Sequence, residues 1–138
     1  MPAPEIVVSA VVFRDPGGKV LTVRKAGTAK FMFPGGKLEP GESAIDAAVR
    51  EVGEELDIRV RAADLRPVGT FTSAAANEPG HSVTATVFEH PYVPVDAPAA
   101  EIAELRWDDL SADAPDDLAP LLADRVFPEL RETGGSDA

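Results

Sequence analysis

The stretch GGKLEPGESAIDAAVREVGEEL, from Gly35 to Leu56, predicts a shaped loop followed by an amphipathic helix. Ser43 and Asp46, three residues apart, match a capping box, so the helix should begin just after Ser43. Apolar residues then recur at helical spacing and form one stripe that faces a core. The members of this stripe are Ile45, Ala48, Val49, Val52 and Leu56.

Three glutamates of the same helix, Glu51, Glu54 and Glu55, lie on an arc beside and opposite the apolar stripe. Like charges at i and i+4 destabilise an isolated helix by about 0.2–0.5 kcal/mol per pair, so a purely structural helix gains nothing from them. A hard divalent cation reverses that sign, because Mg²⁺ prefers oxygen ligands and commonly bridges carboxylates to substrate phosphates. The helix therefore predicts a site for Mg²⁺ or Mn²⁺.

The loop before the helix, PGGKLEPGE, contains three glycines and two prolines in nine residues. Gly35 and Gly36 can bring the backbone close to a ligand where a side chain would clash, and Lys37 adds a positive charge beside them. Arg50 can hold a carboxylate with two hydrogen bonds, so we assign it an orienting role. Its expected partners are Glu42 and the i+4 residue Glu54.

The composition of the 138-residue chain excludes several classes of function. Its formal net charge is −11, which argues against binding to nucleic acid polymers or anionic membranes, since both need clustered Lys and Arg. It has no cysteine, hence no disulfide and no thiolate metal site. No apolar run reaches spanning length, and the first residues do not resemble a signal peptide, so we expect a cytoplasmic protein.

We expect a single domain over residues 1–130, with a flexible tail at 131–138. Alternation and β-rich composition predict strands at 6–13, 19–25, 68–73, 82–90 and 105–110. The turn at 15–18 suggests that the first two strands form a hairpin. A helix is expected over 116–130, which Pro120 could start and Pro128 would end or kink. His81 and His90, at the ends of the fourth strand, are expected to face solvent.

Five residues separate Gly36 from Glu42, and seven more separate Glu42 from the segment REVGEELDI. This spacing resembles the Nudix box, GX5EX7REUXEEXGU, over residues 36–58. The sequence departs from that pattern at Asp57, where the family usually has glycine. Asp tolerates the left-handed backbone conformation better than most residues, so the turn should form.

The resemblance implies an α/β class fold, an α/β/α sandwich around a mixed sheet. It also implies hydrolysis of a diphosphate bond in a nucleoside diphosphate linked to another group, with Mg²⁺ or Mn²⁺ as cofactor. In such proteins the corresponding glutamates bind the metal, here Glu51, Glu54 and Glu55, together with the carbonyl group of Gly35. A further carboxylate outside the box often completes the site, and Glu101 stands where the family often carries one; Glu104 and Glu78 are the alternatives.

Residues that could contact a nucleoside are less clearly marked. Phe33 could stack on a base, although a buried strand edge at 31–33 explains it equally well. The segment PDDLAPLL, residues 115–122, is similar to the segment with which an oxidised-purine triphosphatase reads its base, which would place Asp116 and Asp117 on a purine edge. Two departures from that protein, Ala114 and Met32, count against this, and helix N-capping also explains the pair.

The chain's size and the lack of markers for bulkier substrates favour a (deoxy)nucleoside triphosphate, cleaved to the monophosphate and pyrophosphate as in MutT-type members. ADP-ribose and nucleoside-diphosphate sugars are the alternative substrates. A non-catalytic nucleotide-sensing module is the alternative of another class, although such modules often lack the box acids. The only partner expected is a small nucleotide; a homodimer stays open.

Overall fold

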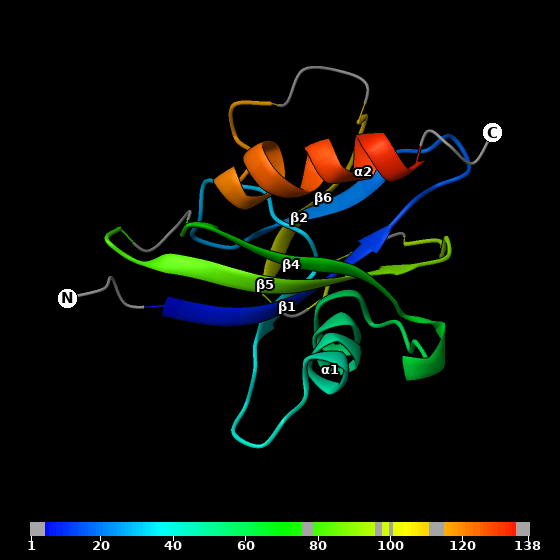
Figure 1. Ribbon diagram of the computed structural model, residues 1–138. Coiled ribbons are helices and arrows are strands. Elements are labelled where there is room, and N and C mark those ends of the chain that lie inside the picture. The colour runs from blue at the N-terminus through cyan, green and yellow to red at the C-terminus, as the bar shows by residue number, and fades with distance from the viewer. Residues whose placement is uncertain (1–4, 76–78, 96–97, 100, 111–114, 135–138) are drawn as a thin grey trace.

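The computed structural model describes residues 5–75, 79–95, 98–99, 101–110 and 115–134. Two helices enclose two β-sheets (Figure 1): α1 (Ala44–Leu56) lies on one side, and α2 (Phe127–Gly134) lies on the other. The expected α/β/α sandwich is confirmed. No helix within the described ranges is long and apolar enough to cross a membrane.

The larger sheet has four strands in the order β3-β1-β5-β4. Their bounds are Gly35–Lys37 for β3, Glu5–Phe13 for β1, Ser82–His90 for β5 and Arg66–Ala74 for β4. β1 runs parallel to β5, and the other pairs are antiparallel, so the sheet is mixed. The second sheet pairs β2 (Val20–Lys25) with β6 (Ile102–Asp108), and a short turn, η1 (Ala62–Asp64), lies between α1 and β4.

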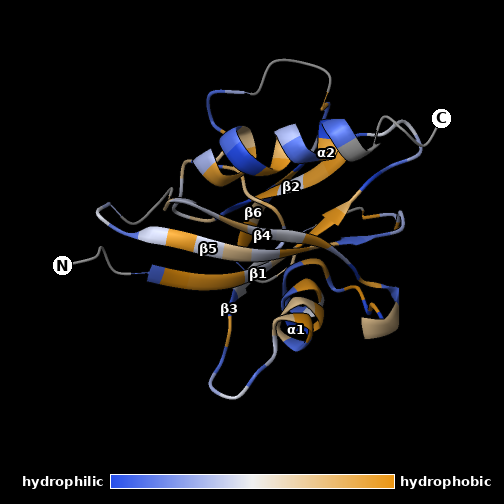
Figure 2. Ribbon diagram, viewed as in Figure 1, coloured by the Kyte–Doolittle hydropathy of each residue, from blue (hydrophilic) through white to orange (hydrophobic). Residues whose placement is uncertain are grey.

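β1 carries a continuous apolar run because both of its faces are covered. Successive side chains of a strand point to opposite faces. Val11 and Phe13 accordingly join the core cluster that includes α1, while Ala10 and Val12 join the cluster that includes α2. Figure 2 shows the apolar residues along β1 and on the helix sides that face the sheets.

The expected hairpin between the first two strands is wrong. β1 and β2 belong to different sheets, and the two segments are joined only beside the turn, by an isolated bridge between Arg14 and Val20 and a 2.8 Å hydrogen bond from the N–H of Asp15 to the carbonyl of Lys19. The reason is that both edges of β1 are already paired, one with β3 and the other with β5. β2 therefore pairs with β6 instead.

The expected helix at 116–130 is shifted toward the C-terminus. A π-helical segment, η2 (Leu121–Val126), starts after Pro120 and continues directly into α2. Pro128 does not end the helix: the N–H of Phe127 donates to the carbonyl of Leu122, five residues back, and this wider turn accommodates a residue without an N–H. α2 continues to Gly134, so residues 131–134 are helical rather than a tail, and 135–138 lie outside the described residues.

The expectation that His90 faces solvent is also wrong. Its side chain is 9% exposed and packs on the ring of Phe13, with 5.3 Å between the ring centroids. β5 is paired on both sides, and the parallel register places Phe13 opposite His90. His81 is partly buried, and its Nδ1 lies 3.2 Å from the carbonyl oxygen of Pro79.

Candidate active site

The helix α1 begins and ends where its sequence predicts. The Ser43 hydroxyl accepts a hydrogen bond of 3.1 Å from the N–H of Asp46, which satisfies one of the free donors of the first turn. At the other end Asp57 adopts the left-handed conformation, with φ 55° and ψ 40°, and its N–H donates to the carbonyl of Gly53 at 3.1 Å. The aspartate thus serves where the Nudix pattern has glycine.

Glu55 is buried, although the helical wheel places it off the apolar stripe. The β3 loop covers it: its side chain accepts a 3.0 Å hydrogen bond from the N–H of Gly35, and the residue is 5% exposed. Lys25, at the end of β2, approaches from the other side with its Nζ 3.7 Å from Oε2. Burial raises the pKa of Glu55 to about 7, while the Gly35 N–H and Lys25 act in the opposite direction.

Glu51 lies directly against the glycine loop. A Cβ atom at Gly36 would stand 1.9 Å from Glu51 Oε2, so this contact exists only because residue 36 has no side chain. The side chain of Glu51 is 15% exposed. Burial raises the pKa of Glu51. The positive charges of Arg50 and Lys25 lower this pKa, and the negative charge of Glu54 raises it. The carboxylates therefore interact electrostatically across the arc.

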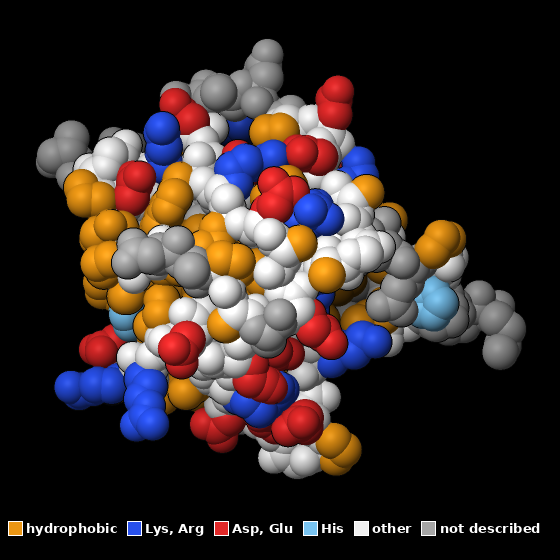
Figure 3. All heavy atoms as spheres, turned by 180° about the vertical axis from the view of Figure 1, so that it is seen from behind, with side chains coloured by type: hydrophobic (Ala, Val, Ile, Leu, Met, Phe, Trp, Pro, Cys, Tyr) orange, Lys and Arg blue, Asp and Glu red, His pale blue; other side chains and the backbone are white. Residues whose placement is uncertain are grey.

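Arg50 fastens the helix to the loop. Its Nε and Nη2 donate to the two carboxylate oxygens of Glu42, at 2.8 and 2.9 Å, and Nη2 also donates to the Lys37 carbonyl at 3.0 Å. Nη1 lies 3.3 Å from Glu54, whose side chain is 52% exposed. The hydrogen bond from Arg50 lowers the pKa of Glu42 to about 2. Seen from behind, acidic and basic side chains intermingle on the lower part of the molecule, where α1 lies (Figure 3).

A cavity of about 440 Å³ joins this charged cluster to an apolar surface. It is lined by the glycine loop, by Glu51 and by two lysines, Lys25 and Lys37. Apolar side chains also line it, among them Ile6 and Val8 of β1, where Val8 pairs with Lys37, and Met32, Ala119, Leu121 and Leu122. One cavity thus offers cationic and backbone groups beside a slot for an apolar or flat group.

Two residues that line the cavity depart from what the sequence predicts: Phe33 is buried, and Lys25 was not predicted to lie at the site. Phe33 is 4% exposed and packs on Phe127, with 6.0 Å between ring centroids, so it forms a fixed wall of the cavity rather than a free stacking surface. Lys25 has no signal of its own in the sequence. Its placement depends on a register irregularity between Arg24 and Lys25, which only the pairing of β2 with β6 reveals.

The structure places the remaining predicted residues outside the lining of this cavity. Asp117 is held by Arg106, with 2.9 Å between Asp117 Oδ2 and Arg106 Nη1, and it lines a separate cavity; Asp116 is exposed. The expected purine-reading edge is therefore not presented to the cavity that Glu51 lines. Of the alternatives to Glu101, Glu104 pairs with Arg24 at 2.6 Å, and Glu78, like Ala114, lies outside the described residues.

Glu101 lies on a segment next to the cluster. Its carbonyl accepts a 2.7 Å hydrogen bond from the N–H of Ala26, which follows Lys25. Two residues before it, the N–H of Ala99 donates to the carbonyl of Glu55 at 2.9 Å. The Glu101 side chain itself is exposed, and its role as a ligand stays a prediction.

The donor set fits a hard divalent cation. Over the described part of the chain, no three His, Asp or Glu side chains already stand at metal-binding spacing, and Arg50 and Lys25 contact the carboxylates instead. Mg²⁺ does not need a protein cage, since it keeps several waters and usually takes one or two carboxylates plus substrate phosphates. The carboxylates Glu51 and Glu55, both largely withdrawn from water, are suitable oxygen donors.

In the metal-free protein, the raised pKa of Glu55 predicts a stability that falls as pH rises. Between about 4.5 and about 7 the unfolded chain is ionised at this residue while the folded protein still holds the proton. The stabilising contribution is therefore complete below about 4.5 and is lost as pH rises through about 7. At about 1.4 kcal/mol per pKa unit, it amounts to at most about 3 kcal/mol.

Thermal unfolding in EDTA across pH 4.5 to 8 measures this effect. The difference between wild type and Glu55→Gln should change with pH in this window, whereas Glu42, with its pKa near 2, is ionised throughout it. Parallel pH profiles of the two proteins would contradict the assignment.

Comparison with known proteins gives a consistent result. The family model described as the NUDIX domain matches residues 3–130. The crystal structure of the MutT protein from Methanosarcina mazei Go1 is similar at 26% identity and a TM-score of 0.79, over 96% of this chain and 97% of that one. A NUDIX hydrolase from Nitrosomonas europaea is 25% identical with a TM-score of 0.67, over 94% and 89%. A UDP-X diphosphatase shares the fold, at 18% identity and a TM-score of 0.75, over 99% and 66%.

Proposed function

The chain belongs to the NUDIX family of pyrophosphohydrolases, and we propose that it hydrolyses a (deoxy)nucleoside triphosphate to the nucleoside monophosphate and pyrophosphate. Enzymes of this family generally act on nucleoside diphosphate derivatives. The proposal rests chiefly on the cavity lined by Glu51 and the glycine loop, because apolar side chains line the same cavity and form a slot beside these groups. A nucleoside fits the slot while its phosphates lie along the glycine loop.

The roles proposed for the charged residues follow from their positions. Glu51, Glu54, Glu55 and the carbonyl of Gly35 would hold Mg²⁺ or Mn²⁺, with Glu101 as a further ligand. The metal would supply charge neutralisation of the phosphates and activation of water. Lys25 and Lys37, which line the same cavity, would add positive charge for the phosphates. Gly36 admits the phosphates close to the backbone.

Arg50 would act by holding Glu42 and Glu54 in place, so its geometry should matter more than its charge. Arg50→Ala should lower kcat, and Arg50→Lys should restore little, because an ammonium group cannot make the paired hydrogen bonds to Glu42. Steady-state kinetics of both variants checks this. A lysine variant with wild-type kcat would show that the charge alone suffices.

The substrate is tested by kcat/KM across canonical and oxidised triphosphates, ADP-ribose, nucleoside-diphosphate sugars and dinucleoside polyphosphates, with Mg²⁺ present. A triphosphate should be cleaved fastest, with pyrophosphate as the second product. Faster turnover of ADP-ribose or of a nucleotide sugar would replace the proposed substrate class.

The Glu54→Gln variant distinguishes a hydrolase from a nucleotide-binding module without catalysis. If the protein is a hydrolase, product formation with Mg²⁺ should disappear in this variant while nucleotide binding remains. A binding module predicts no product with either protein.

A further inference from the structure

Two short segments, residues 31–33 and 117–122, form one apolar wall of the active-site cavity, which they line with Met32, Phe33, Ala119, Leu121 and Leu122. They are joined by backbone hydrogen bonds: the N–H of Phe31 donates to the carbonyl of Asp117 at 2.7 Å, and the N–H of Ala119 donates to the carbonyl of Phe31 at 2.9 Å. A parallel bridge connects Phe31 with Leu118. The two segments therefore form one unit, and Met32 and Leu121 face the cavity from it.

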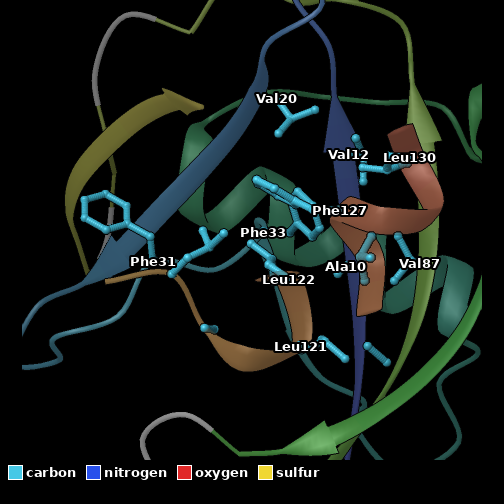
Figure 4. Packing of buried hydrophobic residues seen from close by; sticks show 14 of the residues in the cluster. Ala10, Val12, Val20, Phe31, Phe33, Val87, Leu121, Leu122, Phe127 and Leu130 are labelled. Carbon is cyan, nitrogen blue, oxygen red and sulfur yellow. The ribbon is translucent and has the colours of Figure 1, made fainter. Parts of the chain in front are cut away.

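A second cavity, of about 540 Å³, lies on the other side of this wall. Phe31, Arg106 and Asp117 line it, and Thr28 lines both cavities. Figure 4 shows the side chain of Phe31 at the edge of the buried cluster that also contains Phe33 and Leu122. The wall thus borders a hollow that is open to solvent, and it could shift into this hollow.

Arg106 holds the wall in place from behind. Its guanidinium lies 3.7 Å from the centroid of the Phe31 ring, and its Nη1 donates to Asp117 Oδ2 at 2.9 Å. The hydrogen bond from Arg106 lowers the pKa of Asp117, so the pair stays charged at neutral pH. Both segments of the wall are therefore attached to one side chain of β6.

Arg106 is itself attached to the smaller sheet. Its Nε lies 2.8 Å from Asp108 Oδ1, and the other oxygen of Asp108 accepts a 2.7 Å hydrogen bond from the hydroxyl of Thr22. Asp108 is 6% exposed and Thr22 is fully buried, so the anchor lies inside the smaller sheet, away from solvent.

We propose that Asp117 and Arg106 are positioning residues that set the width of the apolar slot, and so select which groups attached to the diphosphate are accepted. Neither side chain lines the active-site cavity, so their influence passes through the wall. Without the pair, the wall gains freedom to move toward the second cavity, and the slot widens. The proposal rests on the proposed hydrolase function and replaces direct base reading by Asp117.

The first test does not depend on catalysis. The chain has two methionines, so a spectrum of protein labelled with ¹³C-methyl methionine has two signals, and Met32 supplies the one from the wall. In Asp117→Asn and in Arg106→Gln the Met32 signal should shift in the same direction. Asp124→Asn is the matched control, since Asp124 is an exposed acid on η2 whose loss leaves the pair intact. An unshifted Met32 signal in both variants would overturn the proposal.

The second test is selectivity. Two substrates that differ in the size of the group beyond the diphosphate are compared. The kcat/KM for the smaller substrate divided by that for the larger one should fall by about tenfold in either variant, mainly through KM, because one misfitted methylene is worth about that much. The double variant should resemble the single ones, since the two side chains act as one contact. Additive effects would overturn the proposal. The proposal would also be overturned if Asp117→Asn changed only the relative kcat/KM for bases of equal size, since this would show that Asp117 contacts the base directly.

Failure of the hydrolase proposal would be seen separately. A wild-type protein that cleaves no compound of the panel disproves the proposed function, whereas the Met32 signal still reports whether the pair holds the wall.

Discussion

Replacing Glu55 or Glu51 by glutamine is expected to lower kcat by orders of magnitude, because each change removes one of the carboxylates to which the metal is assigned. Glutamine keeps the size of the side chain and removes its charge. The amide oxygen at position 55 can still accept the hydrogen bond from the Gly35 N–H, so the fold should persist. In metal-free protein at neutral pH, Glu55→Gln should even raise the thermal midpoint, because it removes a buried charge.

Asp46→Asn is the matched control for this loss of charge. It removes one acid from the same helix, but at an exposed position whose backbone N–H, not its side chain, makes the contact with Ser43. Its kcat should stay close to that of wild type. A Glu55→Gln enzyme with full activity would refute the role given to this glutamate.

Adding a single methyl group at Gly36 is expected to abolish most activity while the protein still folds. The new Cβ would stand 1.9 Å from Glu51 Oε2, and this carboxylate is the end of a flexible side chain that can turn away. Gly36→Ala should therefore lower kcat about as much as Glu51→Gln. Activity equal to wild type would show that Glu51 need not lie against the loop.

The neighbouring glycine provides the contrast. At Gly35 a Cβ would stand 2.0 Å from the Ser9 carbonyl oxygen and 2.8 Å from the Cα of Ala10, and backbone atoms of a paired strand cannot move aside. Gly35→Ala should destabilise the fold by about 1–3 kcal/mol or more. Denaturant unfolding of both variants distinguishes the two outcomes, since only Gly35→Ala should unfold at lower denaturant concentration.

The parts of this structure that could be predicted are those set by local sequence. The capping box at Ser43, the helical spacing of the stripe and the tolerance of Asp57 for a left-handed turn are each determined within a few residues, and the structure contains all three. Four strands lie within two residues of their predicted bounds; β6 begins at Ile102, three residues before the predicted start, and the short strand β3 was not predicted. The box spacing also indicated the family, because its fixed positions lie within one loop and one helix.

The parts that could not be predicted depend on contacts between distant residues. Glu55 is buried because the β3 loop folds over it, which helical spacing cannot reveal. β1 and β2 separate because strand partners are chosen by the whole sheet. Asp117 is bound by Arg106 on β6, which lies outside residues 115–122, so a resemblance confined to those residues gives no information on where the side chain points.

The metal site on α1 is tested most directly by titrating metal-free protein with Mn²⁺ and following the free ion by electron paramagnetic resonance, without nucleotide. Wild type should bind Mn²⁺, and Glu51→Gln and Glu55→Gln should each weaken binding by at least about tenfold, since these are the carboxylates to which the metal is assigned. Asp46→Asn should bind as wild type does. Equal Mn²⁺ affinity in wild type and both glutamine variants would contradict the assignment of the metal site to α1.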